Sequence, residues 1–231
     1  SDMSEMFRSA INFNQNIGNW DVSSVSNMSR MFSFAAAFDQ NLNSWDVSNV
    51  SNMSEMFNAL PVNRTLPALD SWDVSNVQNM QSMFASTPGG IPPGQRQACP
   101  VAGGFQYWDV SNVSNFQKMF ENSSIIFLTY PGGIPSYGAL GASPFANWDV
   151  SSATTFEKMF DGCRFHATIG GVEQWDCPPG LANCSQMFDD IRGETNLNTY
   201  FDTLIIRWKN NVVANNGPYN VVATNMFPSD G

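Results

Sequence analysis

The stretch from Trp45 to Phe57 reads Trp-Asp-Val-Ser-Asn-Val-Ser-Asn-Met-Ser-Glu-Met-Phe, and it decides the fold. Near copies of this stretch, here called the repeat, recur along the chain of 231 residues. They span Trp20–Phe32, Trp45–Phe57, Trp72–Phe84, Trp108–Phe120, Trp148–Phe160 and Trp175–Phe188. A unit of nearly fixed length, joined by connections of variable length, indicates a tandem-repeat protein. We therefore expect one elongated body of stacked coils without an internal domain boundary.

The repeat has two halves with different periods. In the first half, Trp45 and Val47 are two residues apart, as on one side of a strand, and Asp46 points the other way. In the second half, Val50, Met53, Met56 and Phe57 have the spacing of one face of a short helix, with Ser48 placed as its N-cap. The sequence thus predicts an α/β solenoid of the leucine-rich-repeat type, with a parallel sheet, short helices and about 25 residues per coil.

The repeat is expected to cover residues 1–188, and residues 189–231 are expected to form a C-terminal capping segment. Residues 1–7 match residues 51–57 except that Asp2 replaces Asn52, so the chain starts in mid-repeat and is interpreted as part of a longer protein or as a mature portion. After Phe188 the repeat fades. Apolar residues at 200, 201, 204, 205 and 208 predict an amphipathic helix that covers the last coil.

Charge and composition exclude several classes of partner. The formal net charge is −10, and the only lysines are Lys118, Lys158 and Lys209. Nucleic acid is therefore not expected as a partner, because phosphate binding needs clustered Lys and Arg. An anionic membrane surface is disfavoured for the same reason. No transmembrane segment is expected, since no apolar run approaches the roughly 20 residues that span a bilayer.

One Asp per repeat should project outward from the stack, because Trp and Val on either side of it face the core. These residues, here called the acidic row, are Asp21, Asp46, Asp73, Asp109, Asp149 and Asp176. Adjacent strands lie about 4.8 Å apart, so neighbouring carboxylates would repel by roughly 0.9 kcal/mol in water. Three roles remain open: the Asp side chains accept backbone N–H groups in Asx-turns, bind a cationic partner, or contribute to a calcium site.

Two insertions, at 85–107 and 121–147, both contain Pro-Gly-Gly-Ile-Pro. Insertions in repeat proteins gather on one face, where they contact partners or simply drift at a tolerant surface. Partner-contact candidates in and beside them are Pro88, Ile91, Tyr107, Ile126, Phe127, Tyr130, Ile134 and Tyr137. Asn63 and Asn122 lie in connections and are candidates for glycosylation.

No catalytic constellation, cofactor site or metal site is predicted. The cysteines are Cys99, Cys163, Cys177 and Cys184, which allow two disulfides in an oxidising compartment. Their spacing does not match a zinc ribbon or finger. His166 is the only histidine, and nothing in the sequence supports it as the base of a Cys-His pair.

The repeat, preceded by Phe38-Asp39-Gln40-Asn41-Leu42, resembles the BspA-like leucine-rich-repeat surface proteins, whose repeat also occurs in mycoplasma lipoproteins. The resemblance covers residues 1 to about 188 and departs from the pattern in the two insertions and at Cys177. It implies a non-enzymatic, surface or extracellular protein with a role in adhesion. We expect a structural or adhesive protein that acts through protein–protein contacts and assembly. The alternative is a soluble recognition module that binds a glycan or a cationic peptide on its concave face.

Overall fold

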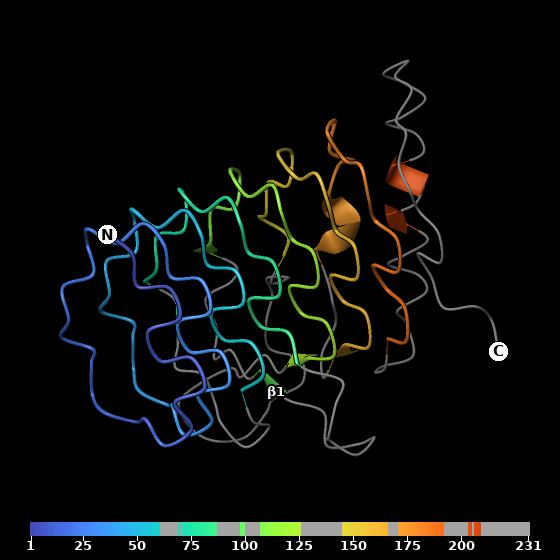
Figure 1. The fold of residues 1–231 in the computed structure, drawn as a ribbon. Helices are drawn as coiled ribbons and strands as arrows, with labels where there is room; N and C mark the ends of the chain where they lie inside the picture. Colours follow the sequence, from blue (N-terminus) through green and yellow to red (C-terminus); the bar gives the residue numbers. More distant parts are fainter. Residues whose placement is uncertain are drawn as a thin grey trace, which may run out of the picture.

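The computed structural model describes residues 1–60, 69, 71–86, 98–99, 107–125, 145–165, 171–191, 203–204 and 206–208. Successive copies of the repeat lie side by side as a stack of coils that runs from the N-terminal to the C-terminal end (Figure 1). Single parallel β-bridges join the same position of consecutive coils, in the order Asp2, Asn27, Asn52, Asn79, Asn115, Thr155 and Asn183. The repeat therefore sets the register of the whole stack.

Regular secondary structure is sparse in the described residues. The strands β1 (Ala98–Cys99), β2 (Ser124–Ile125) and β3 (Arg164–Phe165) form a parallel sheet in the order β1-β2-β3. Ser124 pairs with both Ala98 and Arg164. A 3₁₀ helix, η2, spans Val172–Gln174. β2 and β3 come shortly after the Met-Phe end of their repeats, so in the described residues parallel pairing occurs in this sheet and at the single bridges rather than at Trp-Asp-Val.

The short helix expected over residues 25–32, and over the same positions of the other coils, is replaced by turns. The Met31 N–H donates to the Met28 carbonyl at 3.2 Å, whereas the N–H groups of Met28 and Phe32 donate to the next coil. Between them Arg30 has a φ of 57°, a left-handed conformation that an α-helix does not contain. An α-helix would direct its N–H groups, beyond the first turn, to carbonyls four residues back in the same segment. Here alternate N–H groups join neighbouring coils instead.

The predicted inward face is confirmed by burial. Trp45 and Val47 are 2% and 1% exposed, and Met53, Met56 and Phe57 are at most 1% exposed. The phenylalanines that end the repeat form a column of nearly parallel rings: Phe32 lies 5.7 Å from Phe57, at 5°, and Phe57 lies 5.8 Å from Phe84, at 8°. The column runs through Phe7, Phe32, Phe57, Phe84, Phe120, Phe160 and Phe188.

The tryptophans link coils through their polar atom as well as through burial. The indole N–H of Trp72 donates to the Leu42 carbonyl of the preceding coil at 2.9 Å, and that carbonyl also accepts the backbone N–H of Trp45. Trp45, Trp108 and Trp175 make the equivalent indole bond to the coil before them. A buried indole N–H needs such an acceptor, and here the need fixes one coil against the next.

Helical residues at 203–204 and 206–208 lie against the last coil. Leu204 is buried, and the indole N–H of Trp208 donates to the Trp175 carbonyl at 3.0 Å. The acceptor differs from that of the stacked tryptophans, whose indoles donate to the carbonyl three residues before the preceding Trp. Across the described part of the chain, no helix combines the length and the apolar character needed to cross a membrane.

Candidate interaction face

The acidic row lies outside, as the alternation of Trp, Asp and Val predicts. All of its members are exposed: Asp21, Asp46, Asp73, Asp109, Asp149 and Asp176. In the coil of Asp46, the Oδ1 atom accepts the backbone N–H of Ser48 at 3.1 Å and its hydroxyl at 2.6 Å. The same backbone bond is made to Asp21, Asp73, Asp109 and Asp149. Each of these carboxylates is therefore held in an Asx-turn by its own coil.

These hydrogen bonds also favour the charged form of three carboxylates of the row. The hydroxyl and then the backbone N–H of Ser48 hold the pKa of Asp46 below its ordinary value of 3.8. The serine two residues on lowers the pKa of Asp21 and of Asp109 in the same way. Hydrogen bonds donated to a carboxylate favour its charged form. Asp21, Asp46 and Asp109 consequently stay ionised at neutral pH.

Asp176 differs from the rest of the row because Pro178 stands where the other coils have Ser. Proline has no backbone N–H, so this coil cannot close the same turn. The Asp176 carboxylate instead accepts the Arg207 Nε–H at 2.8 Å, with 68% of the Asp176 side chain exposed. At this position the acidic row holds a guanidinium. The sequence shows Pro178 at this position, and its lack of a backbone N–H could have predicted that Asp176 does not form the Asx-turn.

A pocket of about 260 Å³ opens beside Asp176, between the last two coils. Its lining combines indole and proline rings with polar groups: Trp148, Asp149, Val150, Ser151, Gln174, Trp175, Asp176, Cys177, Pro178 and Pro179. The pocket lies where Cys177-Pro178-Pro179 replaces the Val-Ser-Asn of earlier coils. In those coils the asparagine links neighbours, as when Asn76 donates to the Ser48 carbonyl at 2.7 Å.

The other predicted site residues have different fates. Tyr107 is 72% exposed, directly before Trp108. Asn122 is half-buried with a φ of 57°, and its N–H donates to the Asp161 carbonyl at 2.7 Å. The remaining candidates lie outside the described residues: Asn63, Pro88, Ile91, Ile126, Phe127, Tyr130, Ile134 and Tyr137.

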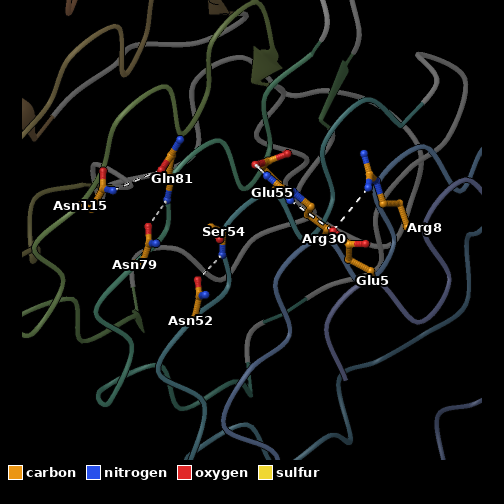
Figure 2. A network of polar contacts seen from close by, with 9 residues as sticks. All are labelled: Glu5, Arg8, Arg30, Asn52, Ser54, Glu55, Asn79, Gln81 and Asn115. Carbon is orange, nitrogen blue, oxygen red and sulfur yellow. Dashed lines mark hydrogen bonds and ion pairs between the residues drawn. The ribbon is translucent and has the colours of Figure 1, made fainter. Parts of the chain in front are cut away.

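Two kinds of polar column run along the stack. In the first, the side-chain oxygen of an asparagine accepts the backbone N–H two residues on, at Asn27, Asn52, Asn79 and Asn115. Figure 2 shows Asn52 accepting the Ser54 N–H, at 3.0 Å, and Asn79 accepting the Gln81 N–H, also at 3.0 Å. Ion pairs that join coils were missed.

In the ion-pair column, Arg30 lies between Glu5 and Glu55, at 3.2 and 2.8 Å (Figure 2). Farther along the stack, Lys158 lies 4.0 Å from Glu121 and 3.6 Å from Asp161. The sequence could have predicted these ion pairs, because Glu5, Arg30 and Glu55 occupy the same position in consecutive repeats and alternate in charge.

Burial raises the pKa of two carboxyls beside Lys158 and of two thiols, Cys177 and Cys184. Burial raises the pKa of Glu121 and of Asp161 above their ordinary values, against the attraction of Lys118 and Lys158. Cys163 and Cys184 are buried and Cys177 is half-buried. Burial, with the neighbouring Cys177, raises the pKa of Cys184 to about 12, so this thiol stays protonated. Within the described ranges, no group of three or more His, Cys, Asp or Glu is placed to hold a metal ion.

The coils share one sequence motif, are stacked in register and each present one carboxylate outward. Such an arrangement defines a tandem-repeat protein with a periodic polar face. The chain belongs to the family described as "Mycoplasma protein of unknown function, DUF285", whose model matches residues 1–90, 96–200 and 134–217. Comparison with curated proteins and with solved structures gave no match.

Proposed function

We propose that this chain is a non-enzymatic structural or adhesive protein of a cell surface or extracellular space, which acts through contacts with other proteins. The single observation that carries the proposal is the acidic row, which is exposed at one position of each coil and is held by Asx-turns at every member except Asp176. A periodic, rigid and charged face suits a partner that contacts several coils at once, because linked contacts bind far more tightly than any one alone.

The proposal includes a fold assignment and a wider family. The coils are taken as a solenoid of the leucine-rich-repeat kind, with turns in the helical half of the repeat, and the chain as one of the BspA-like surface proteins. Its support is the recurring Trp-Asp-Val-Ser-Asn-Val motif together with membership of a mycoplasma family. The two insertions are proposed to add lateral contacts during assembly, an idea that rests on their repeated Pro-Gly-Gly-Ile-Pro sequence.

Retention of the chain on immobilised fibronectin and laminin, as representative matrix proteins, tests the adhesive role. The variant replaces Asp46, Asp73 and Asp109 by Asn, which keeps the side-chain oxygen that accepts the Ser N–H in each turn. A matched control makes the same change of charge away from the row, with Glu173→Gln, Asp189→Asn and Asp190→Asn. The proposal expects weaker retention for the row variant alone, at an unchanged melting temperature. Equal retention by all three proteins would refute a role for the row.

A second candidate function, recognition of a cationic peptide or glycan, is favoured by two observations on the same face. Asp176 already accepts a guanidinium from Arg207 at 2.8 Å, and Tyr107 presents an exposed ring two residues before Asp109. Carboxylates pair well with guanidinium groups, whereas aromatic rings and polar side chains suit sugars.

Calorimetric titration with hexa-arginine and with a chitin hexamer separates the two ligands. Binding of the peptide that is lost in the triple Asn variant supports cation recognition. Binding of the sugar that is lost in Tyr107→Ala supports glycan recognition. If neither ligand binds, this second function is rejected.

A further inference from the structure

The turn that follows the acidic row lacks, in the last coil, an asparagine that earlier coils contain. The Leu181 N–H closes this turn on the Pro178 carbonyl at 3.1 Å, as the Val50 N–H closes the turn that contains Asn49. Gly180 therefore occupies the place of Asn49, directly before the residue whose N–H closes the turn. Because glycine has no side-chain amide, a polar contact that joins earlier coils is not made at this turn.

The acceptor of that contact remains open in the coil before the last one. In earlier coils the side-chain N–H of Asn49 donates to the Ser23 carbonyl at 2.9 Å, and that of Asn112 donates to the Ser75 carbonyl at 2.7 Å. The equivalent carbonyl belongs to Ser151, and no described residue donates a hydrogen bond to it. Ser151 is one of the residues that line the pocket of about 260 Å³ between the last two coils.

The other polar groups of the pocket give it a negative character. The carboxylates of Asp149 and Asp176 both belong to its lining, and both residues are exposed. The Asp149 Oδ1 atom accepts the Ser151 N–H at 2.9 Å, and the described residues donate no hydrogen bond to its second oxygen. The described lining contains no Lys or Arg. Two carboxylates and an open carbonyl suit a ligand that carries positive charge and several N–H donors.

The apolar wall and a neighbouring ion pair favour a planar cation. The rings of Trp148 and Trp175 are parallel, with centroids 6.0 Å apart and an interplanar angle of 3°, and they form a rigid side of the pocket. A guanidinium is flat, carries five N–H donors and is weakly hydrated, whereas an ammonium is a compact and strongly hydrated charge. The chain itself shows this chemistry, because the Arg207 Nε–H donates to the Asp176 carboxylate at 2.8 Å.

We propose that the pocket between the last two coils binds a guanidinium group on a short alkyl chain. Its N–H groups donate to the Ser151 carbonyl, in place of the missing asparagine, and to the carboxylates of Asp149 and Asp176. The alkyl chain lies against Pro178 and Pro179. The proposal rests on the cation recognition proposed above and deepens it, because it assigns one cationic group to one place on the acidic row. An arginine side chain of a protein and a free small guanidine share this chemistry.

Ligand-observed NMR titration with propylguanidinium tests the site, with N-propylurea as the uncharged ligand of similar shape. We expect propylguanidinium to bind and N-propylurea not to bind. Asp149→Asn keeps the oxygen that accepts the Ser151 N–H but removes the charge, so it should weaken binding about tenfold or more. Asp190→Asn makes the same change of charge outside the acidic row, at a φ of 45° that Asn also adopts, and should leave the affinity unchanged. Equal affinity of Asp149→Asn and the parent would overturn the proposal.

Substitutions of Gly180 test the part played by the carbonyl. A Cβ added at Gly180 meets its nearest atom, the Cγ2 of Thr154, at 3.9 Å, so a side chain fits there. Gly180→Asn should restore the contact to the Ser151 carbonyl and abolish binding of propylguanidinium, whereas Gly180→Ala should bind it as the parent does. The melting temperature of each variant verifies that the last coil is folded. If Gly180→Asn bound propylguanidinium as well as Gly180→Ala does, the proposal would be wrong.

Two peptides place the result in context. Tighter binding of acetyl-Gly-Arg-Gly-amide than of propylguanidinium assigns the site to an arginine side chain of a protein partner, and weaker binding assigns it to a free guanidine; both results retain the site. Hexa-arginine separates the pocket from the row as a whole. If hexa-arginine binds and propylguanidinium does not, cation recognition by the row stands and the pocket is rejected. If neither binds, both proposals are rejected.

Discussion

The phenylalanine column makes a prediction that can be worked out from its geometry. Phe57 is 1% exposed and lies between Phe32 and Phe84, with ring centroids 5.7 and 5.8 Å away and interplanar angles of 5° and 8°. Phe57→Leu keeps an apolar side chain but removes both stacked pairs of the column, together with the ring contact to Trp72 at 6.2 Å. Each pair of the column is worth about 0.5–1.5 kcal/mol beyond burial, so the loss of these two pairs alone lowers the free energy of unfolding by about 1–3 kcal/mol.

Truncation at the same position should cost more. Phe57→Ala leaves a cavity between two rings that are themselves fixed by their neighbours, and such truncations cost about 3–5 kcal/mol. Phe34→Ala is the matched control, because Phe34 is 40% exposed and lies outside the column. It should change the free energy of unfolding by about 0.5 kcal/mol or less.

Urea unfolding followed by tryptophan fluorescence measures all three variants, with the shift of the midpoint converted through a shared m-value. We expect the free energy of unfolding to be lowest for Phe57→Ala and higher for Phe57→Leu. Phe34→Ala and the parent should be more stable than both. If Phe57→Leu were as stable as the parent, the stacked rings would add nothing beyond burial. If Phe57→Ala matched Phe34→Ala, the column would not be the core of the stack.

Three further predictions follow from single residues. Burial raises the pKa of Glu121 above 4.5, so its carboxylate destabilises the folded chain at neutral pH, and this destabilisation is relieved as the pH falls through the folded-state pKa. Glu121→Gln should therefore raise the melting temperature at pH 7 and remove the increase in stability toward acid pH. An identical dependence of melting temperature on pH in parent and variant would contradict the assignment. The Ser48 bonds lower the pKa of Asp46, so its contribution is present above the unfolded pKa and is lost as the pH falls; Asp46→Ala should melt earlier than Asp46→Asn in calorimetry, and equal melting would mean that the Asx-turn is not needed. Gly171 has a φ of 107°, and an added Cβ would lie 2.3 Å from the Ala146 nitrogen; Gly171→Ala should cost more than about 1 kcal/mol in urea unfolding, while Gly180→Ala, with its nearest atom at 3.9 Å, should cost far less.

The sequence predicted the inside and the outside of each coil correctly, because side-chain alternation is a local property. Trp45 and Val47 face inward and Asp46 faces outward, as a period of two requires. The Met-Phe half was assigned correctly to the core and wrongly to a helix. Offsets of three, six and seven residues suit one side of a helix, and they also suit successive turns that bury the same side chains.

Two kinds of information were missing from local sequence. Positions with a left-handed backbone conformation are usually occupied by glycine, which makes them recognisable in a sequence. In this chain the turn of each coil gives that conformation to other residues: Glu5, Arg30, Glu55, Ser82, Lys118, Lys158 and Gln186. The gain that stabilises this conformation is the bonding to the next coil, which no single repeat reveals. Pairs such as Arg30 with Glu55 likewise exist only once two repeats are laid in register.

The direction of the hydrogen bonds between coils bears on how proteins of this kind change their length. Each described interface repeats a stacked Phe pair, a parallel bridge at the same position and backbone N–H groups that donate in the same direction. Duplication or loss of one whole coil by recombination would thus join a donor side to an acceptor side and leave each contact satisfied. The stack would grow or shrink by about 4.8 Å at each event. Loss of half a coil would break the register, so selection should preserve length variants that differ by whole repeats.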